Sequence, residues 1–233
     1  LMEKFSSFGY RRIKPPLVEF EDSLLAPGPG ARLAPETFRL MDPVTHRMLG
    51  VRSDITPQIA RIVSSRLENV ARPLRLTYAN DVLRTKGSQM RTERQFTQVG
   101  CELIGQADSV EGDIEVCMLA LLGLKALGIE NITLDLTVTG IVNALLDGVD
   151  DDVIDDVLKS VSRRDVDVIA GYGLPQTDVL AQVMRASGAA ENALEILANV
   201  KTPKLITDSI TRLIVVCEGV HAALNELGIT DVD

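Results

Sequence analysis

Hydrophobic and polar residues alternate in two long segments of the N-terminal half, "PLRLTYAN" at residues 73–80 and the segment from Arg94 to Gly105. A period of two is typical of β-strands, because successive side chains point to opposite faces of a sheet. The polar residues between the two segments predict a loop, so we expect an antiparallel hairpin. "FRLMD" and "MLGVRS", separated by a turn at residues 43–47, predict a second hairpin.

Residues that favour helix ends mark two helices in the same half. Residues 2–8 are expected to form a short helix closed by Gly9, since glycine is favoured just beyond a helix C-terminus. Thr56 and Pro57 predict the start of another helix, because threonine caps N-termini and proline suits the first helical position.

Pro15 and Pro16 interrupt the segment "YRRIKPPLVEF", residues 10–20. Proline has no backbone N–H to donate, so we expect this segment at a sheet edge or an interface rather than in a central strand. "APGPGARLAPE", residues 26–36, is expected to be a loop.

A long helix is predicted over residues 108–128, with Asp108 or Ser109 as its cap. It is followed by "NITLDLT", residues 131–137, which predicts a strand, and by a short helix over residues 140–149. After about residue 150 the periodicity is helical throughout. The pattern therefore predicts an α+β protein with two domains, a mixed core over residues 1–149 and a helical subdomain over residues 150–233.

The composition narrows the classes of partner. Hydrophobic residues make up 45% of the 233 residues and charged residues 24%, and no apolar run is long enough to span a bilayer. The formal net charge of −9 disfavours contact with phosphate backbones. We therefore expect a cytoplasmic protein with no membrane partner and no nucleic-acid partner.

The cysteines and histidines predict no metal site. Cys101, Cys117 and Cys217 lie far apart in apolar patterns, which indicates free, buried thiols in a reducing cytoplasm. His46 and His221 have no cysteine or histidine at ligand spacing, and they complete no Ser/His/Asp or Cys/His arrangement. We therefore predict no cofactor and neither of these two catalytic arrangements.

Gln98 and Glu102 lie at even spacing on the second strand of the long hairpin, so their side chains share one face with Gly100. The opposite face is apolar and is expected to be covered by helices. The polar face leaves space above Gly100 for a ligand. The alternative is a sheet face that is simply wet.

Asp54 and Thr56 form a second polar group at a predicted helix start. An acid, a hydroxyl and the N–H groups of a helix start can together recognise a small zwitterion. The alternative is that both are ordinary N-capping residues, which the spacing alone favours. The spacing nevertheless leaves both interpretations open.

Three segments resemble, in this order, segments of the catalytic domain of histidyl-tRNA synthetases: "GYRRIKPPLVEF", "VRSDITPQIAR" and "VLRTKGSQMRTERQFTQVGCELIG". The resemblance covers approximately residues 2–149. The first segment is similar to class II motif 1, the dimer-forming element, with its proline matched by Pro16, and the third is similar to motif 2. The resemblance implies a class II aminoacyl-tRNA synthetase-like antiparallel sheet flanked by helices, with the helical subdomain as an insertion and the chain truncated before the last core strands.

The resemblance also assigns roles to five residues. Asp54 stands where synthetases use a glutamate to hold the α-amino group of histidine, and Thr56 and Gln98 match other ligands of that group. Glu102 matches the acid that contacts the imidazole. Arg84 matches the motif 2 arginine near the carboxylate and the α-phosphate. A histidine site formed by these five residues is therefore implied.

Lys86 departs from the synthetase pattern. A synthetase has an acid two residues after the motif 2 arginine, where it helps recognise adenine, and Lys86 replaces that acceptor by a donor of opposite charge. No counterpart of motif 3, of the histidine signature or of an anticodon-binding domain is found. "LRTKGSQMRTERQFTQ" is similar instead to the synthetase-like regulatory subunits of ATP phosphoribosyltransferase, the first enzyme of histidine biosynthesis.

This second resemblance implies a non-catalytic regulatory subunit. It would bind a short-form ATP phosphoribosyltransferase catalytic subunit, support its activity, help transmit inhibition by L-histidine, and dimerise through the motif 1-like segment. Two alternatives stay open. One is a histidyl-tRNA synthetase fragment that activates histidine with ATP, and the other is a synthetase-like module with a different amino-acid ligand or a purely structural role.

Overall fold

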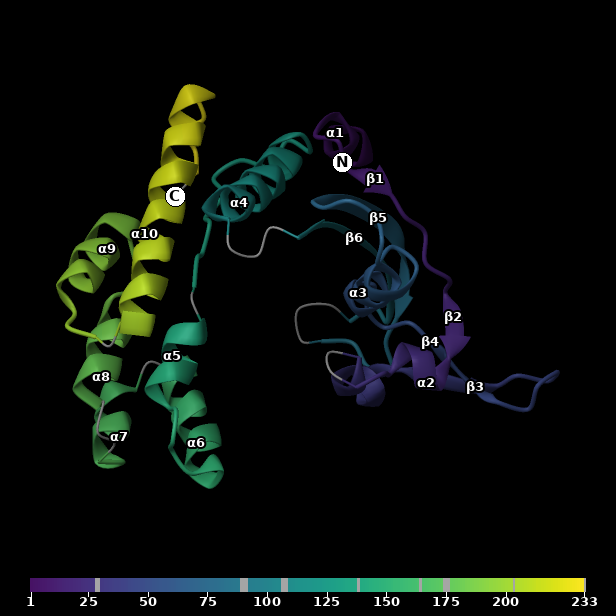
Figure 1. Cartoon of the computed structure of the whole chain (residues 1–233), viewed down its shortest axis with the longest axis horizontal. Coiled ribbons are helices and arrows are strands. Elements are labelled where there is room, and N and C mark those ends of the chain that lie inside the picture. Colours follow the sequence, from purple (N-terminus) through teal and green to yellow (C-terminus); the bar gives the residue numbers. More distant parts are fainter. Residues whose placement is uncertain are drawn as a thin grey trace. The chain divides into compact units, whose positions relative to one another are not determined.

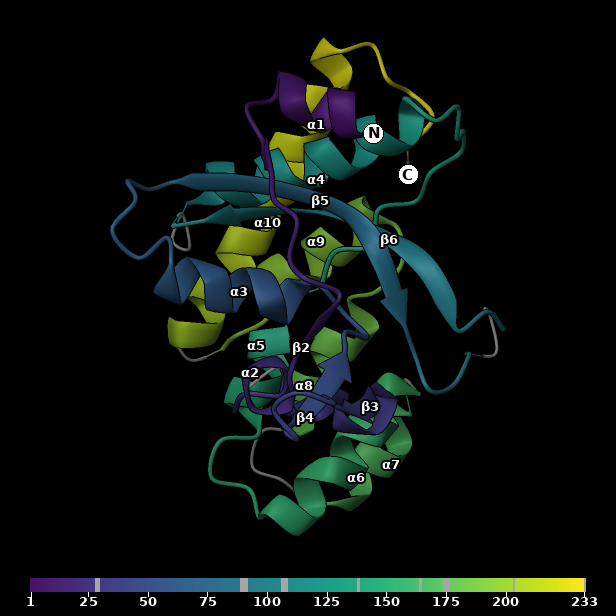
Figure 2. The same cartoon turned by 90° about the vertical axis from the view of Figure 1, so that its right-hand side faces the viewer.

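Strands β5, Leu74–Leu83, and β6, Gln95–Ile104, form the long antiparallel hairpin that the alternating pattern predicts. Their register runs without a break from Leu74 opposite Ile104 to Leu83 opposite Gln95. The short strand β1, Arg11–Arg12, pairs in parallel with β5 and gives the order β1-β5-β6. Figures 1 and 2 show the two long strands curving together side by side.

The computed structural model describes residues 1–27, 30–88, 92–105, 109–137, 139–163, 165–173, 177–202 and 204–232. The chain divides into two compact units, Leu1–Asp108 and Ser109–Asp233. The described part of the first unit holds both sheets. The described part of the second consists of helices, connecting segments and one isolated β-bridge.

A second sheet in the first unit has the order β2-β4-β3 and is antiparallel throughout. Its strands are β2, Val18–Phe20, β3, Phe38–Met41, and β4, Met48–Val51. The β3–β4 pair confirms the shorter hairpin predicted from the sequence. Helix α2, Glu21–Leu24, follows β2, and the expected loop at residues 26–36 instead contains a 3-10 helix, Ala31–Glu36.

Helix α3, Thr56–Ser65, supplies one side of the core beneath the long hairpin. Its apolar stripe, which includes Ile59 and Val63, packs with Ile55 against alternate residues of β5. Burial of these side chains from water is the main force holding the helix on the sheet. The remaining buried members of this core are Leu74, Leu76, Tyr78 and Val82.

Helix α1, Met2–Ser7, also forms as predicted, and Gly9 after it has a φ of +81°, where glycine is favoured. The segment at residues 10–20 supplies edge strands to both sheets, as its prolines predict. The Arg52 side chain is only 3% exposed and links this segment to β5 by hydrogen bonds. Its guanidinium donates to the Pro15 carbonyl oxygen at 2.8 Å and to the Asp81 carbonyl oxygen on β5 at 2.7 Å.

The second unit contains the predicted long helix as α4, Val110–Lys125. The Ser109 hydroxyl caps it by accepting the Gly112 N–H at 3.1 Å, while Asp108 lies outside the described residues. Helix α4 packs with α10, Lys204–Glu226, around a core that includes Met118, Leu121, Val216, Val220 and Leu224.

The strand predicted at residues 131–137 does not form. Within the described residues it makes a single parallel bridge, Ile132 with Val232, and the Ile132 N–H donates to the Asp231 oxygen at 3.1 Å. A strand needs a neighbour along its whole length to satisfy its backbone groups. The alternation instead places Ile132, Leu134 and Leu136 in the apolar cluster with α4 and α10.

The helical character predicted after residue 150 is confirmed, and a shorter helix precedes it near the predicted residues 140–149. The buried residues of these helices, which include Leu145, Val157, Ile169 and Leu180, form one apolar cluster with Ile206 of α10. The boundary between the two compact units lies between residues 108 and 109 of the chain. The division into domains between residues 149 and 150 stays a prediction. The helices are α5, Thr139–Leu145, α6, Asp151–Ser162, α7, Val166–Gly171, α8, Thr177–Arg185, and α9, Ala190–Asn199.

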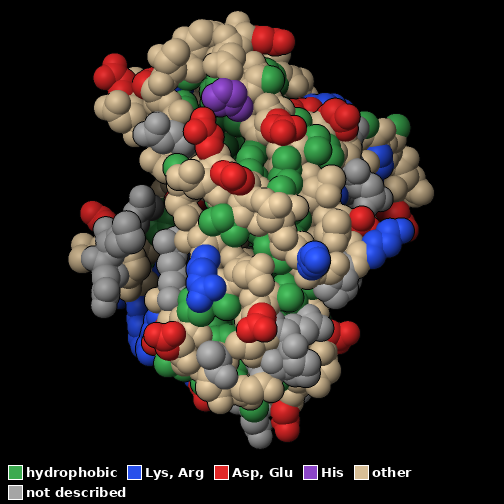
Figure 3. Space-filling model, turned by 90° about the vertical axis from the view of Figure 1, so that its left-hand side faces the viewer, with side chains coloured by type: hydrophobic (Ala, Val, Ile, Leu, Met, Phe, Trp, Pro, Cys, Tyr) green, Lys and Arg blue, Asp and Glu red, His purple; other side chains and the backbone are tan. Residues whose placement is uncertain are grey.

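Among the described residues, no helix is long and apolar enough to cross a membrane. Figure 3 shows one face of the molecule, on which basic side chains lie apart from one another among acidic and apolar ones. A phosphate backbone is held by basic side chains that gather along its path. The described surface in this view offers no such gathering.

Candidate functional site

Hydrogen bonds join Asp54, Ile55 and Gln98 where the chain enters α3, next to the face of the long hairpin that this helix covers. The Ile55 N–H donates to Gln98 Oε1 at 3.0 Å, and Gln98 Nε2 donates to Asp54 Oδ1 at 3.3 Å. The same carboxylate oxygen accepts the Thr56 N–H at 2.8 Å. These bonds fix the Asp54 carboxylate beside the amide of Gln98.

Thr56, Tyr78 and Glu102 form a second chain of hydrogen bonds. The Tyr78 hydroxyl donates to Glu102 Oε1 at 3.2 Å and lies 3.0 Å from the Thr56 hydroxyl. The sequence predicted Thr56 as the cap of α3. Thr56 is instead the first residue of the helix, and its side chain makes no capping hydrogen bond. Its side chain turns to Tyr78, so the three residues link the helix start to both strands of the hairpin.

Tyr78 occupies the space that the sequence analysis reserved for a ligand above Gly100. The two residues are opposite each other in the register of β5 and β6. A Cβ added to Gly100 would lie 2.4 Å from the Tyr78 ring, far inside van der Waals contact. The prediction of ligand space directly above Gly100 is therefore wrong, because the Tyr78 ring packs there.

Burial changes the proton affinity of both acids in this chain of hydrogen bonds. Tyr78 is 3% exposed, and burial raises the pKa of its hydroxyl to about 12. Burial also raises the pKa of the half-buried Glu102, and the hydrogen bonds from Tyr78 and Thr56 oppose that rise. Tyr78 therefore stays protonated at neutral pH and can donate to Glu102.

The polar face of the hairpin is the face that α3 covers, and the interpretation as a simply wet face is wrong. Gln98 and Glu102 are half-buried, whereas Val99 on the opposite face is 38% exposed. Helix α3 thus covers the face that carries the polar residues, while the opposite face is covered in part, since Thr77 there is buried and its hydroxyl donates to the sulfur of Met2 in α1. The reason is the partner strand, because the side chains of β5 that share the face of Gln98 are mostly large and apolar.

Arg84 lies one residue beyond β5 and next to the same entrance to α3. Its Nε donates to the Ser53 carbonyl oxygen at 3.3 Å and lies 3.4 Å from the Glu36 carboxylate. Its guanidinium also lies over the Phe96 ring, 5.3 Å from the centroid. Ser53 precedes Asp54, so four of the five predicted residues form one bonded cluster and Arg84 stands beside it. Lys86 is exposed.

Tyr78 belongs to this cluster but is not among the five residues predicted from the sequence. In "PLRLTYAN" it follows Leu74 and Leu76 at alternate positions, a pattern that is typical of core residues, and it is buried. The available signal was the pairing of a tyrosine with a glycine across the predicted hairpin, which requires the register of the two strands.

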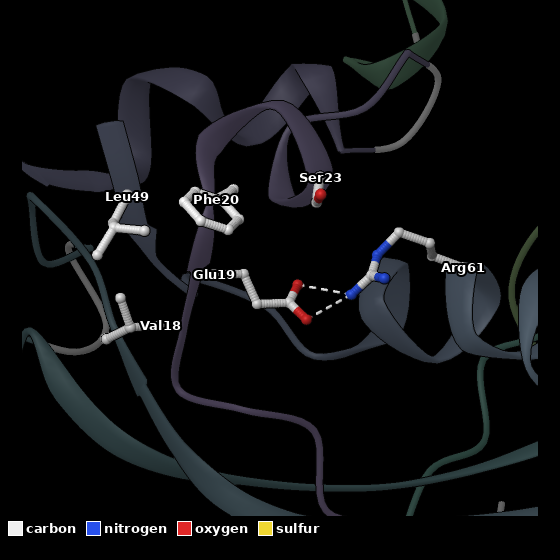
Figure 4. Close-up of a pocket in the computed structure, with 6 residues that line it drawn as sticks. All are labelled: Val18, Glu19, Phe20, Ser23, Leu49 and Arg61. Carbon is white, nitrogen blue, oxygen red and sulfur yellow. Dashed lines mark hydrogen bonds and ion pairs between the residues drawn. The ribbon is translucent and has the colours of Figure 1, made fainter. Parts of the chain in front are cut away.

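A pocket of about 240 Å³ lies elsewhere in the first unit and is drawn in Figure 4. Arg61 Nη2 donates to both oxygens of the Glu19 carboxylate, at 2.5 and 2.6 Å. The two charges neutralise each other across the pocket, so they offer no net charge to a ligand. The pocket is lined by Val18, Glu19, Phe20, Ser23, Leu49 and Arg61.

Within the part of the chain that the structure describes, no group of three or more His, Cys, Asp or Glu residues could hold a metal ion. The three cysteines are partly buried and form no disulfide bond among the described residues. The chemistry of the cluster is therefore that of hydrogen-bond donors and acceptors with two carboxylates.

The sequence matches the family Histidyl-tRNA synthetase over residues 1–230. Since the match covers nearly the whole chain, the chain belongs to the histidyl-tRNA synthetase family. Within this family it is similar to the ATP phosphoribosyltransferase regulatory subunit of Rhodospirillum centenum, with 45% identity over 232 residues. The aligned residues are 99% of this chain and 60% of that relative, and they confirm the resemblance drawn from the three segments.

Solved structures confirm the α+β class II synthetase-like fold. An ATP phosphoribosyltransferase regulatory subunit/histidyl-tRNA synthetase from Bacillus halodurans has a TM-score of 0.81 and 25% identity, over 99% of this chain and 60% of that chain. The ATP phosphoribosyltransferase (HisG:HisZ) complex from Thermotoga maritima contains a chain of the same fold, with a TM-score of 0.67 and 16% identity. The alignment there covers 99% of this chain and 76% of that one. The present chain thus spans 60% of the Rhodospirillum centenum and Bacillus halodurans proteins.

Proposed function

We propose that the chain belongs to a non-catalytic regulatory subunit of ATP phosphoribosyltransferase, which supports the first step of histidine biosynthesis in the cytoplasm and binds L-histidine. The observation that carries this proposal is the 45% identity to a regulatory subunit of that enzyme over 232 residues. The partner is a short-form catalytic subunit. A chain of this fold occurs in the ATP phosphoribosyltransferase complex of Thermotoga maritima, which supports the partner.

The bonded cluster supports histidine as the ligand because its charges match the polar groups of that molecule. Asp54 offers a carboxylate held at a helix start, which suits an α-ammonium group. Glu102 lies at the other end of the cluster, beyond Tyr78, where a carboxylate suits the N–H of an imidazole. Arg84 beside Ser53 supplies positive charge for the carboxylate of the ligand.

Lys86 disfavours the alternative of a histidyl-tRNA synthetase fragment that activates histidine with ATP. The family places an acid there to recognise adenine, and an exposed lysine cannot accept the hydrogen bond of an exocyclic amine. A histidine site that is kept while adenine recognition is lost suits a protein that senses the amino acid and does not activate it.

We propose in addition that the subunit dimerises through the sheet that contains the motif 1-like segment. One face of the β2-β4-β3 sheet is apolar throughout, yet none of its side chains is buried. An exposed apolar face of this kind is typical of a subunit interface. The residues on this face are Val18, Phe20, Phe38, Leu40, Leu49 and Val51.

The regulatory role is tested by adding the full-length protein to an isolated short-form catalytic subunit. We expect phosphoribosyl transfer to ATP to rise by about 5- to 150-fold, the range of ordinary coupling free energies. Histidine should then inhibit the complex more strongly than the catalytic subunit alone. Unchanged activity at saturating protein would contradict the proposal.

Dimerisation is tested with Val18→Glu and Leu40→Glu, which place charges on the apolar face where the two side chains are 36% and 40% exposed. Sedimentation velocity should show the wild-type full-length protein as a dimer and each variant shifted toward the monomer, because a stable interface buries roughly 1,600 Å² or more and a buried unpaired charge is unfavourable in it. Leu127→Glu, at a 56% exposed position beyond α4, serves as the control and should stay dimeric. A monomeric wild type at high concentration would refute this interface.

Histidine recognition is tested by calorimetric titration of the full-length protein and its Glu102→Ala variant. Loss of a charge-assisted hydrogen bond worth ~1.5–3 kcal/mol should weaken binding roughly ten- to a hundred-fold. Gln95→Ala is the matched control, because Gln95 is exposed on the opposite face of β6 and should leave the affinity unchanged. Equal affinities of wild type and Glu102→Ala would remove Glu102 from the site, and no binding by wild type, alone or with its catalytic partner, would remove the site itself.

A further inference from the structure

Asn80 carries a buried amide that the cluster leaves without a partner. The residue is 8% exposed, and its Nδ2 has no hydrogen-bond partner among the described residues. A buried N–H donor without an acceptor is unfavourable, since folding has removed the water that would otherwise bind it. Such a group in a native fold calls for a specific explanation.

The register of the hairpin places Asn80 inside the cluster. It lies directly opposite Gln98, where facing Cβ atoms are about 4.5–5.5 Å apart, and two residues from Tyr78 on the same face of β5. On its other side stands the apolar pair of Val82 and Phe96. The Asn80 side chain, with its unpaired Nδ2, thus lies between the apolar pair of Val82 and Phe96 and the polar groups that we assign to histidine binding.

We propose that Asn80 donates a hydrogen bond from Nδ2 to the carboxylate of the bound amino acid. This inference rests on the proposed histidine site and adds a residue to it. The α-ammonium group has no acceptor for a second donor, and the imidazole is assigned to Glu102, which lies opposite Leu76 and four residues along the strand from Gln98. The carboxylate is bonded to the same carbon as the ammonium group, so it is the ligand acceptor nearest to a donor beside Gln98.

The role of Asn80 complements that of Arg84. Arg84 already interacts with the Glu36 carboxylate and the Ser53 carbonyl oxygen, so its charge is shared with groups of the protein. A neutral donor that no protein group uses gives the ligand carboxylate a contact for which nothing in the described site competes. Asn80 would therefore favour amino acids with a free carboxylate over the corresponding amines.

The test compares histidine binding by wild type, Asn80→Ala and Asn80→Asp in the full-length protein with its catalytic subunit, by calorimetric titration. We expect Asn80→Ala to weaken binding about ten-fold or more, since the lost bond involves a charged acceptor. Asn80→Asp has nearly the same shape but sets a negative charge against the carboxylate, so it should weaken binding further. Thr97→Ala, on the exposed opposite face of β6, is the control and should leave the affinity unchanged.

A second measurement uses histamine, which lacks the carboxylate, and determines its affinity by displacement of bound histidine. Its affinity relative to histidine should rise in Asn80→Ala, because the advantage of the carboxylate is reduced. The unfolding midpoint of Asn80→Ala should equal or exceed that of wild type, since the substitution removes an unpaired buried donor. A structural role predicts the reverse, a lower midpoint.

Several results would overturn the assignment. Equal histidine affinity of wild type and Asn80→Ala would remove Asn80 from the site while leaving the histidine site in place. Tighter binding by Asn80→Asp would show that the Asn80 side chain accepts from the ammonium group instead. Equal weakening toward histidine and histamine would indicate a purely structural effect. Failure of wild type to bind histidine would overturn the proposed site together with this contact.

Discussion

The packing of Tyr78 over Gly100 is the constraint on which the candidate site depends. Only a glycine opposite Tyr78 leaves room for the ring, since even a single Cβ there would lie 2.4 Å from it. With the ring in place, one hydroxyl reaches Thr56 at the start of α3 and Glu102 on β6. These hydrogen bonds therefore link the long hairpin to α3 at the point where polar groups are buried.

The order of the cluster follows from this contact. Asp54, Gln98 and the backbone of α3 satisfy one another around the helix start, and Arg52 fixes the edge segment that leads to the second sheet. A site whose side chains are already held loses little freedom when a ligand binds. The amide of Asn80 is the exception within it, because its donor has no partner among the described residues.

The alternating pattern was enough to predict the long hairpin and the shared face of Gln98 and Glu102, and Thr56 and Pro57 were enough to predict the helix start. The pattern was not enough to say which face α3 covers, because that depends on the partner strand and its large apolar residues. The predicted strand at residues 131–137 shows the same limit, since alternation describes where side chains point and not whether a neighbour exists. The burial of Arg52 and the unpaired amide of Asn80 depend on distant segments, and no local pattern marks them.

The proposed function combines a class II synthetase-like fold with a site for an amino acid but without the activation of that amino acid. Lys86, at the position of an acid that recognises adenine, is the residue on which this separation rests. The most direct measurement is ATP–pyrophosphate exchange by the full-length protein at a histidine concentration that titration shows to be saturating. The account predicts bound histidine and no exchange above background. Histidine-dependent exchange that Arg84→Ala abolishes would contradict it.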